Sequence, residues 1–164
     1  ADVKERKLRV LPSKMARDLI VLLGGGPTPI PFGELYTALQ QSMVDGAENN
    51  PPSFYTSRHY EVARHYSLDE HTRIPDVVIF SQRIWEGLTP AARAWLAQAA
   101  AESVEFQRKL WIEKTREALA AVEQAGVKIY RPDKQPFVEA TKPMYDAITD
   151  PRIADLAKRI RAVE

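Results

Sequence analysis

The first part of the chain alternates between strand spacing and helix spacing of its hydrophobic residues. Residues 7–11 alternate apolar and polar positions in the manner of a strand. Pro12 and Ser13 then supply a break and an N-cap for a helix that ends at the glycine triplet 24–26. Residues 27–31, Pro-Thr-Pro-Ile-Pro, cannot be helical because each proline lacks an amide donor and pushes its predecessor toward extended geometry. They predict an extended segment or an edge strand. The apolar positions of the predicted helix are Met15, Leu19, Ile20, Leu22 and Leu23.

The middle of the chain continues the same alternation. Helical spacing resumes over residues 35–43, and residues 44–47 then predict a short strand. A polar turn at 48–52 leads into a helix expected over residues 55–62. Residues 77–80, Val-Val-Ile-Phe, form a continuous apolar run rich in β-branched side chains. Such a run is typical of a strand that is buried on both faces, with helices on either side.

One predicted helix is longer than a small domain. Thr89 and Pro90 provide its N-cap and first-turn proline, and helical spacing continues to Gly126. At about 1.5 Å per residue this helix would exceed roughly 50 Å, whereas a small domain is about 30 Å across. A coiled coil is not favoured, because polar residues interrupt any heptad seam and the chain predicts no second long helix. The interrupting residues are Ser103, Gln107 and Lys114. We therefore expect the helix to lie across two lobes.

The end of the chain completes a mostly α/β layered architecture. Residues 127–130 predict one more strand. Two amphipathic helices are expected over residues 137–148 and 153–163. The order of strands and helices along the whole chain favours layers of helices packed on parallel strands.

Composition and charge exclude several classes of protein. The 164 residues include 45% hydrophobic and 27% charged residues, which is ordinary for a globular protein. The net charge is +1 and basic residues are interleaved with acidic ones, so docking on a nucleic-acid backbone is not expected. Cysteine is absent, which excludes disulfides, thiolate zinc sites and thiol nucleophiles. No apolar run approaches the roughly 20 residues of a membrane span, so we expect no direct membrane insertion.

None of the common catalytic or cofactor motifs is complete. The triple glycine at 24–26 lacks the Gly-Lys-Ser/Thr of a phosphate loop, and the chain has no Gly-x-Ser-x-Gly elbow. Asp45 and Glu48 form a possible carboxylate pair, but carboxylates in turns are more often solvated or capping groups. The histidines are spaced by six residues rather than the four of paired zinc ligands. They are His59, His65 and His71. We expect no catalysis, no cofactor and no metal.

Three features stand above this background. Arg9 lies within a predicted strand, Phe32 follows the proline segment, and Asn49 and Asn50 follow another strand. An arginine can grip a carboxylate through two charge-assisted hydrogen bonds, each worth about 1.5 to 3 kcal/mol. A simpler interpretation stays open: Arg9 as an outward ion-pair partner, Phe32 as a core residue, and the asparagines as a turn.

Several segments together resemble the DctP-type solute-binding subunit of TRAP (tripartite ATP-independent periplasmic) transporters. The clearest are residues 27–40, beginning Pro-Thr-Pro-Ile-Pro-Phe-Gly, and residues 44–49, Val-Asp-Gly-Ala-Glu-Asn. The similarity extends back to Lys-Leu-Arg-Val at 7–10 and forward along the long helix to residue 127, and it thins after Pro143. Further matching segments are residues 60–62, 80–81 and 88–90.

The resemblance implies a periplasmic-binding-protein-like fold of two α/β lobes that close on a ligand like a hinged clamp. By the same resemblance the chain begins where the family's second lobe begins. It would then comprise the core of the second ligand-binding lobe (7–75), a return strand with the long lobe-spanning helix (76–126), and a C-terminal strand and helices (127–164), with the first lobe largely missing. The implied partners are a small organic acid and the TRAP membrane subunits, in the periplasm.

The resemblance also implies roles for individual residues. The family arginine matched by Arg9 grips the ligand carboxylate, the aromatic matched by Phe32 packs against the ligand, and the asparagine matched by Asn49 hydrogen-bonds near the carboxylate. Asn50 adds an amide available to a ligand hydroxyl, and Glu48 completes the candidate turn. His71 lies in the stretch 67–71, Ser-Leu-Asp-Glu-His, which is similar to the branch associated with sugar acids such as uronates.

A second hypothesis treats the chain as an assembly module. Strand edges and a helix face meant for another lobe would expose apolar surface, and association or domain swapping between copies would cover it. Such a truncated chain would self-associate without binding a ligand by itself.

Overall fold

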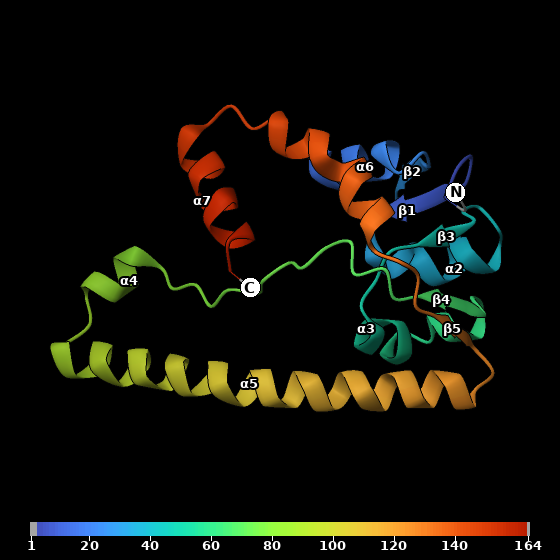
Figure 1. Cartoon of the computed structure of the whole chain (residues 1–164). Helices are drawn as coiled ribbons and strands as arrows, with labels where there is room; N and C mark the ends of the chain where they lie inside the picture. Colours follow the sequence, from blue (N-terminus) through green and yellow to red (C-terminus); the bar gives the residue numbers. More distant parts are fainter. Residues whose placement is uncertain (1–2, 164) are drawn as a thin grey trace.

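In the computed structural model, which describes residues 3–163, parallel strands form two small sheets (Figure 1). The first sheet has the order β2-β1-β3. Its strands are β1 (Lys7–Val10), β2 (Gly26–Pro29) and β3 (Gly46–Ala47). The second sheet pairs β4 (His65–Ser67) with β5 (Lys128–Tyr130). Parallel pairing requires crossover connections, and helices supply them.

The first sheet is wound in two directions from its central strand. Helix α1 (Lys14–Leu22) leads from β1 to β2, and α2 (Leu35–Gln40) leads from β2 to β3 on the other side of β1. The Ser13 hydroxyl accepts from the Ala16 amide at 3.1 Å and caps α1, as the sequence predicts. Gly24 ends this connection with a φ of +88°, a conformation that favours glycine. The proline segment forms the edge strand β2, also as predicted.

The long helix α5 (Pro90–Gln124) has 35 residues and runs along one side of the molecule beyond the two sheets (Figure 1). The Thr89 hydroxyl accepts from the Ala92 amide and caps it. Only its C-terminal end is buried, where Val122 packs with Phe54 and Val127. Trp95 near the other end is 70% exposed. The long helix is therefore confirmed, and one end of it is anchored in a core.

Shorter helices surround the sheets. Helix α3 (Pro51–Thr56) contacts the C-terminal half of α5, and α6 (Gln135–Asp146) contacts α1. Helix α4 (Gln82–Glu86) precedes α5, and α7 (Pro151–Arg161) follows α6. Both C-terminal helices agree with the sequence prediction. Within residues 3–163 no helix combines the length and the apolar character needed to cross a membrane.

The predicted buried strand at residues 77–80 is wrong. This segment has no regular secondary structure, and the exposed fractions of Val77, Val78 and Ile79 are 74%, 72% and 83%. A strand exists only where a neighbour accepts its backbone hydrogen bonds, and none of the described strands pairs with this segment. Its apolar composition indicates a preference for burial, but composition does not supply a partner strand.

The helix expected over residues 55–62 is also shorter than predicted. Helix α3 ends at Thr56, Arg58 has a φ of +57°, and a separate 3-10 turn covers His59–Glu61. A left-handed residue interrupts helical hydrogen bonding, so one helix cannot run through this position. The helix predicted over residues 35–43 stops at Gln40. Strand β4 was not predicted, because its sequence His-Tyr-Ser contains no β-branched residue and no apolar run.

Candidate functional site

The residues singled out in the sequence gather at the carboxyl ends of the first sheet's strands. Arg9 precedes the last residue of β1, and its register partner on β3 is Ala47. Glu48 and Asn49, the two residues after Ala47, therefore lie beside the end of β1 that carries Arg9. Phe32 lies three residues after β2, on the other side of β1. In open parallel sheets this edge, where the chain winds in opposite directions from adjacent strands, is where ligands bind.

Arg9 is buried without a counter-ion. Its side chain is 2% exposed, and its Nε donates to the Ile30 carbonyl at 2.8 Å. Its Nη2 is also buried but has no hydrogen-bond partner, and no carboxylate of the described residues lies within ion-pair distance. Burial lowers the pKa of Arg9, and the charge of Glu48 opposes that effect only in part. An outward ion-pair role for Arg9 is therefore wrong, and the guanidinium keeps a donor available.

Phe32 is not a core residue either. Its ring is 44% exposed, and Cζ of Arg9 lies 5.8 Å from the ring centroid. His59 contacts the same ring edge to face at 5.5 Å between centroids. His59 is 3% exposed, and burial together with the nearby Arg9 charge lowers its pKa, which favours the neutral imidazole beside the cation. The arrangement presents an apolar aromatic surface next to the guanidinium.

Glu48 and His71 share a cleft of about 380 Å³ between α1, α6 and residues 71–74. Burial raises the pKa of Glu48, while the charges of His71 and Arg9 act in the opposite direction. Nδ1 of His71 lies 2.8 Å from the Asp69 carboxylate, and this hydrogen bond raises the pKa of His71. Its Nε2 is buried without a partner. Asp69 thus orients the imidazole and favours its protonated form, which offers a donor at Nε2.

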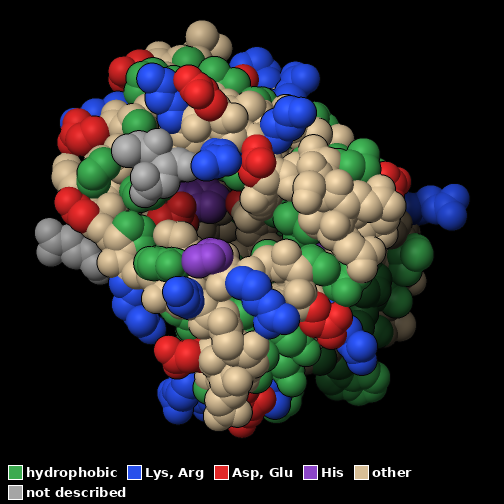
Figure 2. All heavy atoms as spheres, turned by 90° about the vertical axis from the view of Figure 1, so that its right-hand side faces the viewer, with side chains coloured by type: hydrophobic (Ala, Val, Ile, Leu, Met, Phe, Trp, Pro, Cys, Tyr) green, Lys and Arg blue, Asp and Glu red, His purple; other side chains and the backbone are tan. Residues whose placement is uncertain are grey.

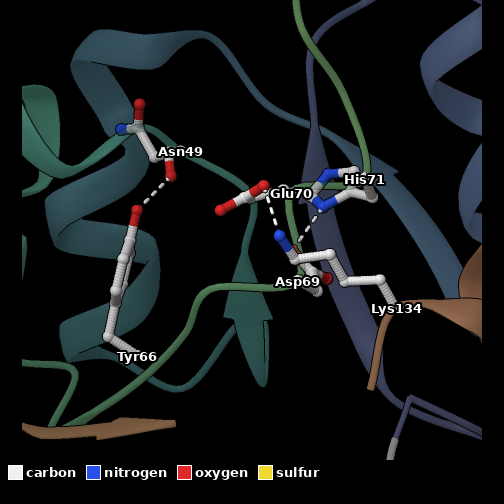
Figure 3. A network of polar contacts seen from close by, with 6 residues as sticks. All are labelled: Asn49, Tyr66, Asp69, Glu70, His71 and Lys134. Carbon is white, nitrogen blue, oxygen red and sulfur yellow. Dashed lines mark hydrogen bonds and ion pairs between the residues drawn. The ribbon is translucent and has the colours of Figure 1, made fainter. Parts of the chain in front are cut away.

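The two asparagines have different environments. Oδ1 of Asn49 accepts from the Asn50 amide at 2.9 Å, and its Nδ2 is buried without a partner. The Asn49 backbone carbonyl accepts from the Tyr66 hydroxyl at 2.6 Å, as Figure 3 shows. Oδ1 of Asn50 accepts from the Ser53 amide and forms the N-cap of α3. Asn50 is exposed, so the structure gives it a local capping role.

Unpartnered donors are concentrated in this group of residues. Five buried side-chain polar atoms of residues 3–163 lack a hydrogen-bond partner, and three of them are Arg9 Nη2, Asn49 Nδ2 and His71 Nε2. Buried polar atoms are normally paired, so three unpaired donors near one sheet edge need an explanation. All three can donate to oxygen, and one belongs to a cation. The arrangement suits an acceptor-rich anion such as a carboxylate that also carries hydroxyl groups.

A second cleft, of about 410 Å³, opens between the two sheets. It is lined in part by Asp45, Asn49, His59, His65 and Tyr66. Figure 2 shows one histidine side chain within a hollow of the surface and a second at its rim, with charged side chains around them. No cluster of three histidine or carboxylate side chains in the described part of the chain is arranged to hold a metal ion.

Three residues of this site were not predicted from the sequence. Tyr66 and Asp69 had no signal in periodicity, because their importance comes from contacts with residues of other elements. His59 was assigned to the surface or to packing, and its burial against Phe32 agrees with a packing role. For Asp69 the available signal was its place in the stretch 67–71, whereas Tyr66 lies inside a short strand and gave none.

Comparison with known proteins decides the family. A model of the bacterial extracellular solute-binding protein family 7, named DctP, matches residues 1–151. The chain belongs to this family. The resemblance inferred from the sequence motifs is thereby confirmed, together with the α/β fold of TRAP solute-binding proteins.

Three relatives show the extent of the similarity. The protein YiiZ of Salmonella typhimurium is 42% identical over 167 residues, covering 99% of this chain and 50% of the relative. A TRAP periplasmic solute-binding protein from Xanthobacter autotrophicus, solved with bound β-D-galacturonate, is 40% identical with a TM-score of 0.94. One from Roseobacter denitrificans, solved with bound β-D-glucuronate, is 38% identical with a TM-score of 0.94. Each of the two structural matches covers 99% of this chain and 55% of the solved chain. The chain spans about half the length of the curated relatives it matches.

Proposed function

We propose that this chain provides the carboxylate-binding part of an extracytoplasmic solute-binding protein for a uronate-type sugar acid. The observation that carries the proposal is Arg9, a cation that is 2% exposed, has no ion-pair partner and keeps a buried donor unused. Burying such a charge is unfavourable unless something pairs with it. A ligand carboxylate would supply both the missing charge and the missing acceptor.

The proposed ligand class follows from the remaining groups. A uronate carries one carboxylate and several ring hydroxyls, so it needs one cationic anchor and a set of neutral donors and acceptors. Arg9 is the anchor, Asn49 and His71 offer donors, and Glu48 offers an acceptor. The galacturonate and glucuronate bound to two relatives of 40% and 38% identity support this choice over a dicarboxylate.

Phe32 would pack against the apolar face of the sugar ring. Its side chain is 44% exposed and adjoins the guanidinium, so a carboxylate on Arg9 brings the attached ring close to the aromatic surface. Stacking of this kind gives contact area at low conformational cost, since Phe32 is already held by His59. The division of roles is usual for small-ligand sites, where apolar walls give contact and a few polar groups give orientation.

The role of the protein would be capture and delivery without chemical change. The relatives are solute-binding proteins, and the unpartnered donors at the sheet edge suit an anion. We propose that the ligand is captured in the periplasm and passed to the membrane subunits of a TRAP transporter. This places the protein outside the cytoplasmic membrane.

Calorimetric titration of the full-length protein that carries this chain tests the proposal. D-Galacturonate and D-glucuronate should bind. D-Galactose and D-glucose differ from these uronates only at the carboxylate carbon, and because they lack the carboxylate they should not bind. Succinate tests the dicarboxylate alternative. Equal binding of sugar and uronate, or tight binding of succinate alone, would contradict the proposed ligand class.

A second candidate is self-association of this chain, favoured by its exposed apolar side chains. Trp95, Phe106 and Ile112 on α5 are 70%, 68% and 63% exposed, and residues 77–79 are exposed as well. Apolar side chains exposed to this extent favour association. Light scattering of the 164-residue chain over a concentration series should then show a rising mass, and a constant monomer mass would exclude this candidate.

A further inference from the structure

Tyr66 links the candidate site to a hydrophobic core. None of the proposed ligand contacts belongs to that core. It lies in the middle of β4, and its hydroxyl donates to the backbone carbonyl of Asn49 at 2.6 Å (Figure 3). Its ring stacks on Phe54 with 4.7 Å between centroids and 26° between planes. Phe54 packs in turn with Val122 of α5. One side chain therefore links the turn after β3 to the anchored end of the long helix.

The turn that carries Asn49 has little support of its own. Strand β3 has only two residues, and α3 begins at Pro51. Between them the side chain of Asn49 accepts from the next amide and that of Asn50 caps α3, so both side-chain contacts stay within this short segment. The Tyr66 hydroxyl supplies the contact across to another sheet. Without it, the backbone carbonyl of Asn49 would lose its only described donor.

The chemistry of Tyr66 suits a permanent donor. Burial raises its pKa, and the nearby charges of Asp69 and Glu48 raise it further, so the hydroxyl stays protonated over the physiological range. The ring is held by stacking, so the direction of the hydroxyl is set before any ligand arrives. A tyrosine is well accommodated where its ring packs on apolar groups and its hydroxyl has a hydrogen-bond partner.

We propose that Tyr66 is a positioning residue for the solute site, which anchors the carbonyl of Asn49 and so holds the Asn49 side-chain amide ready for the ligand. This inference rests on the proposed function, since it takes Asn49 as a ligand contact. Nδ2 of Asn49 is buried without a partner, so its direction depends on how its backbone is held. A group held in place before binding costs less to order when the ligand arrives.

The test compares Tyr66→Phe with a matched control in the full-length protein. Phenylalanine keeps the ring on Phe54 and removes only the hydroxyl. Tyr55→Phe is the control, because Tyr55 is 40% exposed and stacks on Tyr60 in a similar way, with no hydrogen bond from its hydroxyl in the described structure. Two measurements are made on each variant: amide hydrogen exchange without ligand, and calorimetry with D-galacturonate.

Hydrogen exchange judges the positioning role even if no uronate binds. In Tyr66→Phe, amides of residues 48–50 should exchange about fivefold faster, the effect of losing one neutral hydrogen bond, while those of α5 stay unchanged. Unchanged exchange at 48–50, or equal acceleration throughout the chain, would overturn the inference.

Calorimetry then judges the link to the ligand. Affinity for D-galacturonate should fall about tenfold in Tyr66→Phe and stay constant in Tyr55→Phe. Faster exchange with unchanged uronate affinity would also overturn the inference, since the turn would be held for some other reason. Wild-type protein that binds no uronate would instead refute the proposed function, while the exchange result would still decide whether Tyr66 holds the turn.

Discussion

Replacing Arg9 by methionine should remove ligand binding while leaving the ligand-free fold nearly as stable as before. The two effects separate because Arg9 is a charge buried for a ligand rather than for the fold. Its side chain is 2% exposed and has no ion-pair partner. Methionine is unbranched and uncharged, so it follows the aliphatic part of the arginine side chain without a desolvation penalty.

The magnitudes follow from the contacts of the guanidinium. Replacing a buried ion pair by apolar side chains is neutral or stabilising by about 1 to 4 kcal/mol, and we apply the same range to the unpaired Arg9 cation. The Ile30 carbonyl would lose its donor, which costs about 1 to 3 kcal/mol. These terms nearly cancel, so the free energy of unfolding should stay within about 2 kcal/mol of wild type. Two charge-assisted bonds to a carboxylate are worth about 3 to 6 kcal/mol, so affinity should fall at least about a hundredfold.

The assay combines urea unfolding without ligand and calorimetry with D-galacturonate. Arg17→Met is the control, because Arg17 is an exposed arginine of α1 with no described ion pair or side-chain hydrogen bond. It should change neither quantity. An Arg9→Met protein that binds as wild type would refute the carboxylate role of Arg9. A loss of stability well above 2 kcal/mol would refute the argument that its charge is uncompensated.

Three further predictions test other parts of the structure. Phe32→Ala should weaken uronate binding by about 1 to 2 kcal/mol and hardly change the free energy of unfolding, since the ring is 44% exposed. Calorimetry and urea unfolding measure the two quantities. A large loss of stability would show that Phe32 is a core residue instead. Asp69→Asn should lower the pKa of His71, measured by NMR titration of the imidazole, because the hydrogen bond to Asp69 is the main cause that raises it. The stability that this hydrogen bond contributes is complete below the ordinary histidine pKa of 6.5 and is lost as pH rises through the raised pKa, so the variant should lack this pH dependence. An unaltered titration of His71 would contradict the role given to Asp69. Thr89→Ala should lower the free energy of unfolding, measured in urea, by about 1 kcal/mol because it removes the N-cap of α5. Replacing the exposed Thr149 by alanine should leave that free energy unchanged. Equal effects of the two substitutions would count against the capping role of Thr89.

Local signals account for the elements that the sequence predicted correctly. Ser13 and Thr89 begin their helices because their hydroxyls accept free amides of the first turn. Gly24 ends its connection in a left-handed conformation that other residues avoid. Each of these effects involves residues within a few positions of one another, so the linear pattern contains the whole cause.

Segments that depend on distant partners were predicted less well. Residues 77–80 have the composition of a buried strand but lie exposed and unpaired. Strand β4 forms because it pairs with β5, which lies more than sixty residues further along the chain. The three residues of β4 have no strand-like pattern by themselves. The left-handed Arg58 divides a segment whose apolar spacing suggested one helix.

The candidate site shows the same division. Motifs of neighbouring residues were enough to indicate the family, the strand that carries Arg9, and the position of Phe32 and Asn49 just beyond strand ends. The linear pattern gave no sign that Arg9 is buried without a counter-ion, that Asp69 hydrogen-bonds to His71, or that the Tyr66 hydroxyl donates to the Asn49 carbonyl. The physical reason is that burial and hydrogen bonding depend on which elements pack together, and residues far apart in the chain determine that packing.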